Sequence, residues 1–245
     1  MLLNISSISS LKWPVMILLS GILVILPSLL LIQKGGCAMG KTSGAQVIEL
    51  PMPNRVSSSS LEKTLSKRRS IRRYTEKPVA LEHIAQLLWA AQGITNPRGN
   101  RTSPSAGALY PLEVYAIVGN SEDIAAGIYH YRPSKHQLEM VLSGDHRGEL
   151  CKAGLSQSAI CNAPLSIAMT GVFERTTGKY GKRGIQYVFM EVGHAAQNVL
   201  LQAVSINLGA VPIGAFDNKA VSRTLNLPES ETPLYIICVG HPVTD

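Results

Sequence analysis

The sequence is poor in aromatic and charged residues, and several common functional patterns are missing from it. Aromatic residues make up 5% and charged residues 16% of the 245 residues. No basic strip carries interleaved aromatic side chains, the combination that binds single-stranded nucleic acid, so no nucleic-acid partner is expected. The sequence also lacks the Gly-x-Gly-x-x-Gly loop of dinucleotide-binding domains and the nucleophile elbow of serine hydrolases. A Rossmann domain and a hydrolase are therefore disfavoured.

Cysteine usage gives no metal-site pattern. The four cysteines, at positions 37, 151, 161 and 238, show no C-x-x-C spacing, and the six histidines are scattered, so no bound metal is predicted. A disulfide between Cys151 and Cys161 is the less favoured alternative to two free thiols. Cys238 lies in an apolar strand pattern and is expected to pack in the core.

A long uncharged run lies near the N-terminus. Residues 15–32 are 18 residues without a charge, flanked by Lys12 and Lys34, and this just reaches the length of a membrane span. We expect residues 1–34 to be an uncleaved anchor that makes the protein membrane-associated, on a side of the membrane that the flanking lysines leave undecided. A cleaved export signal or a lipoprotein signal ending at Cys37 is the alternative.

The remaining chain is long enough for one domain with a sizeable core. Residues 35–60 are rich in Gly, Ser and Pro and are expected to be a flexible tether before a single domain at 61–245. The predicted helices are 61–67 (capped by Ser60), 81–92, 146–160, 185–206 and one starting at Asn218 (capped by Asp217). The predicted strands are 113–118, 127–132, 137–142, 165–170 and 234–240. This order predicts an α+β domain with a central mixed sheet flanked by helices.

A cationic stretch stands out between the first two predicted helices. Residues 67–73 contain five cations and one hydroxyl, Ser70, and no acidic residue. Guanidinium groups bind phosphate oxygens bidentately, so the stretch favours a multivalent anion. A basic surface patch that contacts nucleic acid or lipid headgroups is the alternative.

Two other stretches suggest a ligand site. The loop 102–111 has small residues at 105–108, which let a backbone approach a flat or anionic ligand, although an ordinary tight connection would look similar. Residues 176–184 interrupt the regular pattern with three glycines around Lys179 and Tyr180. The helix after them carries a polar stripe, which fits a half-exposed face, a pocket lining or a dimer seam: Glu191, His194, Asn198 and Gln202.

Five motifs, read in order, carry a family resemblance. They are Arg68–Arg72, Pro104–Leu109, Lys179–Gly181, Gly193–Asn198 and Pro212–Phe216. Together they resemble the nitroreductase superfamily of FMN-dependent oxidoreductases, and within it the SagB-type dehydrogenases, which include the thiazole/oxazole (azoline) oxidases. The resemblance covers about residues 60–243.

The resemblance implies a nitroreductase-like fold, an intertwined homodimer and FMN at the dimer interface. The FMN-binding residues that it implies are Arg68, Arg69, Ser70, Arg72, Pro104, Ser105, Ala106, Gly107, Asn198, Pro212, Ile213 and Gly214. It also implies that Lys179 and Tyr180 are catalytic and remove a proton while hydride passes to the flavin. The simpler alternative is that Lys179 binds an anion and Tyr180 only packs.

The function implied is hydride transfer between a small-molecule or peptide substrate and flavin N5. An NAD(P)H-dependent nitro or quinone reductase is the alternative, and a flavin-binding or anionic-lipid-binding module is the non-enzymatic one. Two departures from the resemblance are visible. The residues before the domain are expected to be only an anchor and a tether, whereas peptide-modifying members commonly carry an extra N-terminal region for engaging partners. His241 stands where relatives often place a basic residue for the flavin.

Overall fold

One seven-stranded sheet organises the part of the chain that the computed structural model describes, residues 46–243. The strand order is β1-β4-β3-β2-β5-β7-β6, and all pairings in this order are antiparallel. The α+β class with flanking helices is confirmed, whereas the expectation of a mixed sheet is wrong. Neighbouring strands such as β3 and β4 are joined by tight turns, which require antiparallel pairing.

The strands are β1 (Val47–Glu49), β2 (Leu112–Val118), β3 (Gly127–Arg132), β4 (Gln137–Ser143), β5 (Leu165–Gly171), β6 (Gly209–Ile213) and β7 (Thr232–Gly240). The helices are α1 (Leu61–Lys67), α2 (Leu81–Gln92), α3 (Arg147–Ala153), α4 (Ser158–Cys161), α5 (Glu174–Tyr180), α6 (Arg183–Ser205) and α7 (Asn218–Thr224). A 3₁₀ turn, η1 (Ala106–Ala108), lies between α2 and β2.

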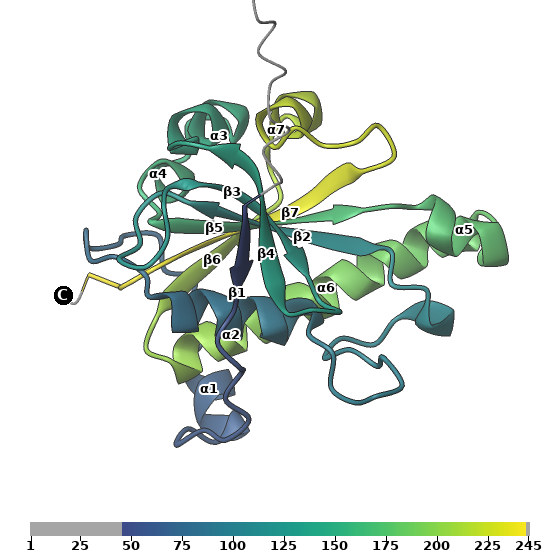
Figure 1. Cartoon of the computed structure of the whole chain (residues 1–245), viewed down its shortest axis with the longest axis horizontal. Coiled ribbons are helices and arrows are strands. Elements are labelled where there is room, and N and C mark those ends of the chain that lie inside the picture. Colours follow the sequence, from purple (N-terminus) through teal and green to yellow (C-terminus); the bar gives the residue numbers. More distant parts are fainter. Residues whose placement is uncertain (1–45, 244–245) are drawn as a thin grey trace, which may run out of the picture. The chain divides into compact units, whose positions relative to one another are not determined.

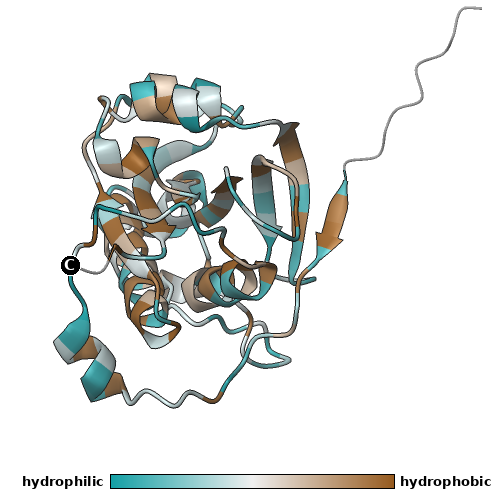
Figure 2. Ribbon diagram, turned by 90° about the vertical axis from the view of Figure 1, so that its left-hand side faces the viewer, coloured by the Kyte–Doolittle hydropathy of each residue, from teal (hydrophilic) through white to brown (hydrophobic). Residues whose placement is uncertain are grey.

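Helices cover both faces of the sheet. Helices α2 and α6 lie on one face, and α3, α4 and α7 lie on the other (Figures 1 and 2). The inner strand β7 shows why its sequence is almost wholly apolar. Ile237 and Val239 pack in the core beneath α2 and α6, while Ile236 and Cys238 pack in the core beneath the other helices. Cys238 is fully buried, as expected, and burial raises the pKa of its thiol to about 12.

Several helices form where helix caps and hydrophobic periodicity in the sequence predict them. Ser60 Oγ accepts a hydrogen bond from the Lys63 amide at 3.2 Å, and Asp217 Oδ1 accepts one from the Ala220 amide at 2.8 Å. The apolar face predicted for the long helix is buried along its length in α6, at Val188, Val192, Ala196, Val199 and Ala203.

The single helix predicted over 146–160 is wrong. The chain forms α3 and α4 instead, because Leu155 and Ser156 between them adopt left-handed backbone conformations with φ of 60° and 56°. The two short helices are joined by a disulfide between Cys151 and Cys161, the pairing that the sequence left as the less favoured alternative.

The interruption expected at 176–184 is also largely helical. Residues up to Tyr180 belong to α5, and the chain turns at Gly181, with φ of +54°, before α6 starts. Gly184 allows the two helices to meet closely, since an added Cβ would lie 2.9 Å from the Thr176 backbone. Lys179 and Tyr180 therefore stand on the last turn of a helix.

Part of the segment expected to be a tether forms the edge strand β1. It pairs with β4, and the Leu50 amide that follows donates to the His136 carbonyl at 3.1 Å. The predicted anchor at residues 15–32 lies outside the described residues. No helix between residues 46 and 243 is both long enough and apolar enough to cross a membrane. The expectation that the protein is membrane-associated is therefore withdrawn.

Candidate active site

The cationic segment (residues 68–72) runs beside the start of β6. Ser70 forms a parallel bridge with Ala210, and the Ile71 amide donates to the Ala210 carbonyl at 3.0 Å. Ile71 packs closely on Gly209, where an added Cβ would lie 2.7 Å from Ile71 Cγ2. Any side chain at position 209 would therefore push the segment away from the sheet.

Side chains of the cationic segment divide between its two sides. Because side chains alternate along extended backbone, Arg68, Ser70 and Arg72 lie on the side opposite to Ile71. Ser70 and Arg72 are exposed and Arg68 is half-buried. Arg69 is engaged elsewhere: its Nη1 donates to the carbonyls of Ser66 at 3.1 Å and Arg68 at 2.8 Å. Two guanidinium groups and one hydroxyl thus remain open to an anionic ligand.

The end of β6 supplies an open stretch of backbone on the same strand. Pro212 is half-buried and Gly214 is exposed, whereas Ile213 is buried and packs in the core on the α7 side. A Cβ added to Gly214 would meet only Tyr235, at 3.7 Å. Of these three predicted residues, Pro212 and Gly214 can face a ligand, and Ile213 supports them from the core.

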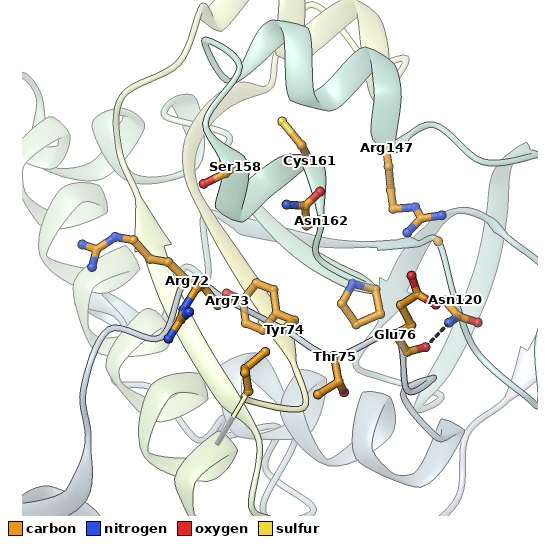
Figure 3. Close-up of a pocket in the computed structure, with 13 residues that line it drawn as sticks. Arg72, Arg73, Tyr74, Thr75, Glu76, Asn120, Arg147, Ser158, Cys161 and Asn162 are labelled. Carbon is orange, nitrogen blue, oxygen red and sulfur yellow. Dashed lines mark hydrogen bonds between the residues drawn. The ribbon is translucent and has the colours of Figure 1, made fainter. Parts of the chain in front are cut away.

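A cavity of about 870 Å³ borders the far end of the cationic segment. Arg72 and Arg147 lie on opposite sides of it in Figure 3, and Asn120 and Asn162 add amide groups to its wall. Arg147 is oriented by Asp145, with Nη2 at 2.6 Å from Oδ2. The cavity wall is therefore polar and partly cationic next to Arg72.

The predicted small-residue loop is a tight turn built on internal hydrogen bonds. Ser103 is buried and donates to the Ala91 carbonyl at 2.8 Å, and Ser105 Oγ accepts from the Tyr110 amide at 2.9 Å. Gly107 adopts φ of +63°, a conformation that favours glycine. Pro104 and Gly107 are exposed, and Ser105 and Ala106 are half-buried between them. The loop thus presents backbone and small side chains to its surroundings.

The structure brings Lys179 and Tyr180 directly against this loop. A Cβ added to Gly107 would lie 2.8 Å from Tyr180 Oη and 3.1 Å from Lys179 Nζ. Lys179 Nζ lies 5.5 Å from the Tyr180 ring centroid, and the Tyr180 ring packs edge-on against Tyr187 at 5.1 Å. Only glycine at position 107 leaves room for the pair, so loop and pair form one unit, called here the loop–pair unit (residues 104–107 with 179 and 180).

Asn198 supports the loop from α6. Its Nδ2 donates to the Thr102 carbonyl at 3.3 Å and to Ser103 Oγ at 3.1 Å. The amide hydrogens of Asn198 are therefore used by the protein itself. A direct contact between Asn198 and a cofactor stays a prediction.

The cationic segment and the pair Lys179–Tyr180 lie at opposite ends of α6. Helix α5 lies at one end of α6 and β6 lies beyond the other (Figure 1). Helix α6 has 23 residues, so the two ends are about 35 Å apart. One small cofactor cannot reach from its phosphate to its reacting atom over that distance within one chain.

Two further residues lie behind the loop: Arg101, which the sequence did not single out, and Glu191, which it placed only in a polar stripe. Arg101 stacks over the Tyr110 ring at 4.3 Å and donates to Gln92 Oε1 at 2.9 Å. Glu191 is 3% exposed on the buried side of α6. The sequence signal that could have identified Glu191 was a carboxylate within a helix whose other inward-facing positions are apolar.

His241 is a poor replacement for the basic residue of relatives. Its backbone carbonyl accepts from the Thr75 amide at 2.9 Å. Partial burial, followed by the charge of Lys77, lowers the pKa of the imidazole below its ordinary value. The protonated form of His241 is therefore disfavoured.

Comparisons with known proteins show the family of this chain. The sequence pattern of the Nitroreductase family matches residues 65–241. MJ1384 of Methanocaldococcus jannaschii, named provisionally as a nitroreductase, is 41% identical over 196 residues, which are 80% of this chain and 98% of that protein. The microcin B17-processing protein McbC of Escherichia coli is 30% identical over 169 residues, 66% of this chain and 62% of McbC. A crystal structure of a provisional nitroreductase from Ralstonia eutropha JMP134 superposes with a TM-score of 0.71 at 27% identity, covering 83% of this chain and 92% of that one. The chain belongs to the nitroreductase family.

Proposed function

We propose that this chain is an FMN-dependent oxidoreductase whose active site is assembled from two copies of the chain. The observation that carries the proposal is the contact of Gly107 with Lys179 and Tyr180 at one end of α6, while the cationic segment lies at the other end. One end offers groups that bind phosphate, and the other offers groups that accept or donate a proton. When bound, FMN supplies two-electron hydride chemistry at its N5 atom.

The cationic segment fits the phosphate end of FMN. Arg68 and Arg72 would hold the phosphate through their guanidinium forks, and the Ser70 hydroxyl would add a directional hydrogen bond. Pro212 and Gly214 would lie beside the ring, because the space next to Gly214 is open. Ser70 is bridged to β6, Pro212 lies on that strand and Gly214 follows it, so β6 fixes the spacing between the cationic segment and the open backbone.

A second copy of the chain brings the two ends of α6 together. Ile185, Phe189 and Met190 are large apolar residues on α6 and are 41%, 54% and 51% exposed. Such a group on one long helix indicates a protein partner. An antiparallel pair of α6 helices related by two-fold symmetry would cover these side chains. It would also place the loop–pair unit of one chain beside the cationic segment of its partner, twice per dimer.

The pair Lys179–Tyr180 favours dehydrogenation of a C–N or C–C bond, as in the SagB-type branch. In such a step the unprotonated form of either Tyr180 Oη or Lys179 Nζ would take a proton from the substrate, and bound FMN would supply the acceptor for the hydride. Helix α5 supports the pair by holding both side chains against Gly107. The similarity to McbC, a microcin B17-processing protein, favours a peptide as the substrate.

Reduction of nitro or quinone compounds with NAD(P)H is the second candidate function. It is favoured by the similarity to MJ1384, which extends over 98% of that protein. Reduction of an external acceptor needs FMN and a nicotinamide donor, and does not require a base at Lys179 or Tyr180.

Lys179→Ala and Tyr180→Phe separate the two functions. We expect dehydrogenation of a thiazoline-containing peptide, followed as a loss of two hydrogens by mass spectrometry, to fall by about 10²-fold or more, since a positioned base contributes that much. FMN content and NAD(P)H-driven reduction of a nitroaromatic and a quinone should persist. Lys182→Ala, which removes a neighbouring exposed cation, is the matched control.

Three outcomes distinguish the dehydrogenase from the reductase. Loss of peptide oxidation only in the two test variants supports the dehydrogenase. Unchanged peptide oxidation in both would show that neither residue is the base. Robust nitro or quinone reduction by a wild-type protein that leaves the peptide intact would favour the reductase.

A further inference from the structure

Helix α6 carries one carboxyl group within the core. Glu191 is 3% exposed and lies next to the buried Val192. Among residues 46–243, neither Glu191 Oε1 nor Gln92 Nε2 has a hydrogen-bond partner. A carboxylate in such a place is costly, because an ionised group loses its hydration on burial. A neutral carboxylic acid suits the position better.

The surroundings of Glu191 contain the small-residue loop. Burial raises the pKa of Glu191 to about 7, although the polar side chains of Ser105 and Gln92 beside it and the charge of Arg101 act in the opposite direction. Ser105 Oγ already accepts a hydrogen bond from the Tyr110 amide. A hydroxyl oxygen has a second lone pair, which a protonated Glu191 can use as its acceptor.

Other charged and titratable groups around this site belong to the segment between α2 and β2, to β2, to α5 and to α6. From the segment before the loop, Arg101 is the cation that acts on Glu191 directly. The groups that in turn act on Arg101 are Tyr110, Glu113, Arg175 and Glu191 itself. On α6, Tyr187 and His194 are one turn before and after Glu191, and α2 contributes the neutral Gln92.

Glu191 and the pair Lys179–Tyr180 hold the same loop from two sides. Ser105 is near enough to Glu191 to act on its pKa, and Gly107, two residues later, contacts Tyr180 Oη. Tyr180 packs on Tyr187, which lies one helical turn before Glu191 on α6. A shift of the loop at Ser105 is therefore transmitted to the contact at Gly107.

We propose that Glu191 is a positioning residue that carries a proton beneath residues 104–107 and so sets the contact of Gly107 with Lys179 and Tyr180. A protonated Glu191 donates to Ser105 and leaves the loop in the arrangement described above. An ionised Glu191 can only accept hydrogen bonds, so it turns the Ser105 hydroxyl round and attracts Arg101. The contact of Gly107 with Lys179 and Tyr180, on which the active arrangement depends, is then lost. The inference rests on the proposed function only where it concerns turnover.

The test compares Glu191→Gln with wild type in the full chain, because glutamine is a neutral side chain of similar shape. Glu149→Gln, which neutralises an exposed carboxyl group on α3, is the matched control. At each pH, turnover of the best substrate by wild type and by the control is divided by that of Glu191→Gln, which cancels the titration of Lys179 and Tyr180. This ratio should fall about tenfold per pH unit above neutral pH, as for a group that must stay protonated.

Two readouts on the flavin-free protein are independent of turnover. The infrared band of a protonated carboxyl group should titrate out near neutral pH in wild type and be missing from Glu191→Gln. Amide hydrogen exchange of residues 102–110, corrected for intrinsic rates, should become faster above neutral pH in wild type only.

The outcomes separate this inference from the proposed function. The same pH profile in Glu191→Gln and wild type would overturn it, as would a wild type without a carboxyl band that titrates near neutral pH. A wild type that shows the band and the loop response but has no flavin turnover would contradict the proposed function and leave the proton on Glu191 established.

Discussion

Replacing both Arg68 and Arg72 by alanine should give a folded protein that no longer retains FMN. Both side chains lie on the open side of the cationic segment, while the segment itself is fixed by the Ile71 contacts to β6. A hydrogen bond to a charged group contributes about 1.5–3 kcal/mol. Loss of two such interactions with the phosphate should weaken FMN binding by about 10²- to 10⁴-fold.

The measurement is the visible absorption spectrum of the purified protein, with the released chromophore identified by mass. Lys219→Ala/Arg223→Ala removes the same charge from the exposed side of α7 and should keep its FMN. A double Arg variant that binds FMN as tightly as wild type would show that the cationic segment serves another anion. A wild type that cannot be reconstituted with FMN would contradict the cofactor itself.

Glu191→Gln should be more stable than wild type at alkaline pH. The pKa of Glu191 is about 7 in the folded protein, against an ordinary value of 4.5. Between these values the folded protein holds a proton that the unfolded chain lacks. The stabilisation is therefore complete below pH 4.5, declines as the pH rises, and is gone above about pH 7. The difference corresponds to about 3 kcal/mol.

Urea unfolding of the two proteins at pH 5, 6, 7 and 8 measures this effect. Relative to Glu191→Gln, the free energy of unfolding of wild type should fall by about 2.5 kcal/mol from pH 5 to pH 8, because part of the loss has already occurred at pH 5. Other titrating groups are common to both proteins and cancel in the comparison. Glu149→Gln should follow wild type. A constant difference between wild type and Glu191→Gln at all four pH values would mean that Glu191 titrates normally.

Periodic and capped elements were predictable because their signals are local. The apolar face of α6 repeats at helical spacing, and Ser60 and Asp217 stand where their helices begin. The hairpin of β3 and β4 is likewise a local feature, with its turn between two alternating runs.

The wrong predictions fall where the backbone conformation does not follow from the residue types. Gly154 ends α3, but the left-handed conformations fall on Leu155 and Ser156, so residue type alone does not show that the chain turns there before α4. In α5, Gly178 stands inside the helix and made the segment look irregular. Strand β6 follows α6 closely and was not predicted, and the antiparallel order of the sheet depends on pairings between distant segments.

The candidate site was predictable in its parts and not in its geometry. Charge and residue size alone single out the cationic segment and the small-residue loop, but the contact of Gly107 with Tyr180 joins residues far apart in the sequence. The role of Lys179 came from the family resemblance. Glu191 was visible as a member of a polar stripe, yet its burial depends on how α2 and the loop pack against α6.

The central claim is that each active site combines the cationic segment of one chain with the loop–pair unit of another. The most direct test mixes two variants that are inactive alone in peptide dehydrogenation, Arg68→Ala/Arg72→Ala and Lys179→Ala/Tyr180→Phe, by unfolding and refolding them together with FMN. Each mixed dimer then has one intact site and one site with all four changes, so random pairing should restore about a quarter of wild-type activity. A mixture no more active than its separate components would contradict the shared site, because it would mean that each chain builds its site alone.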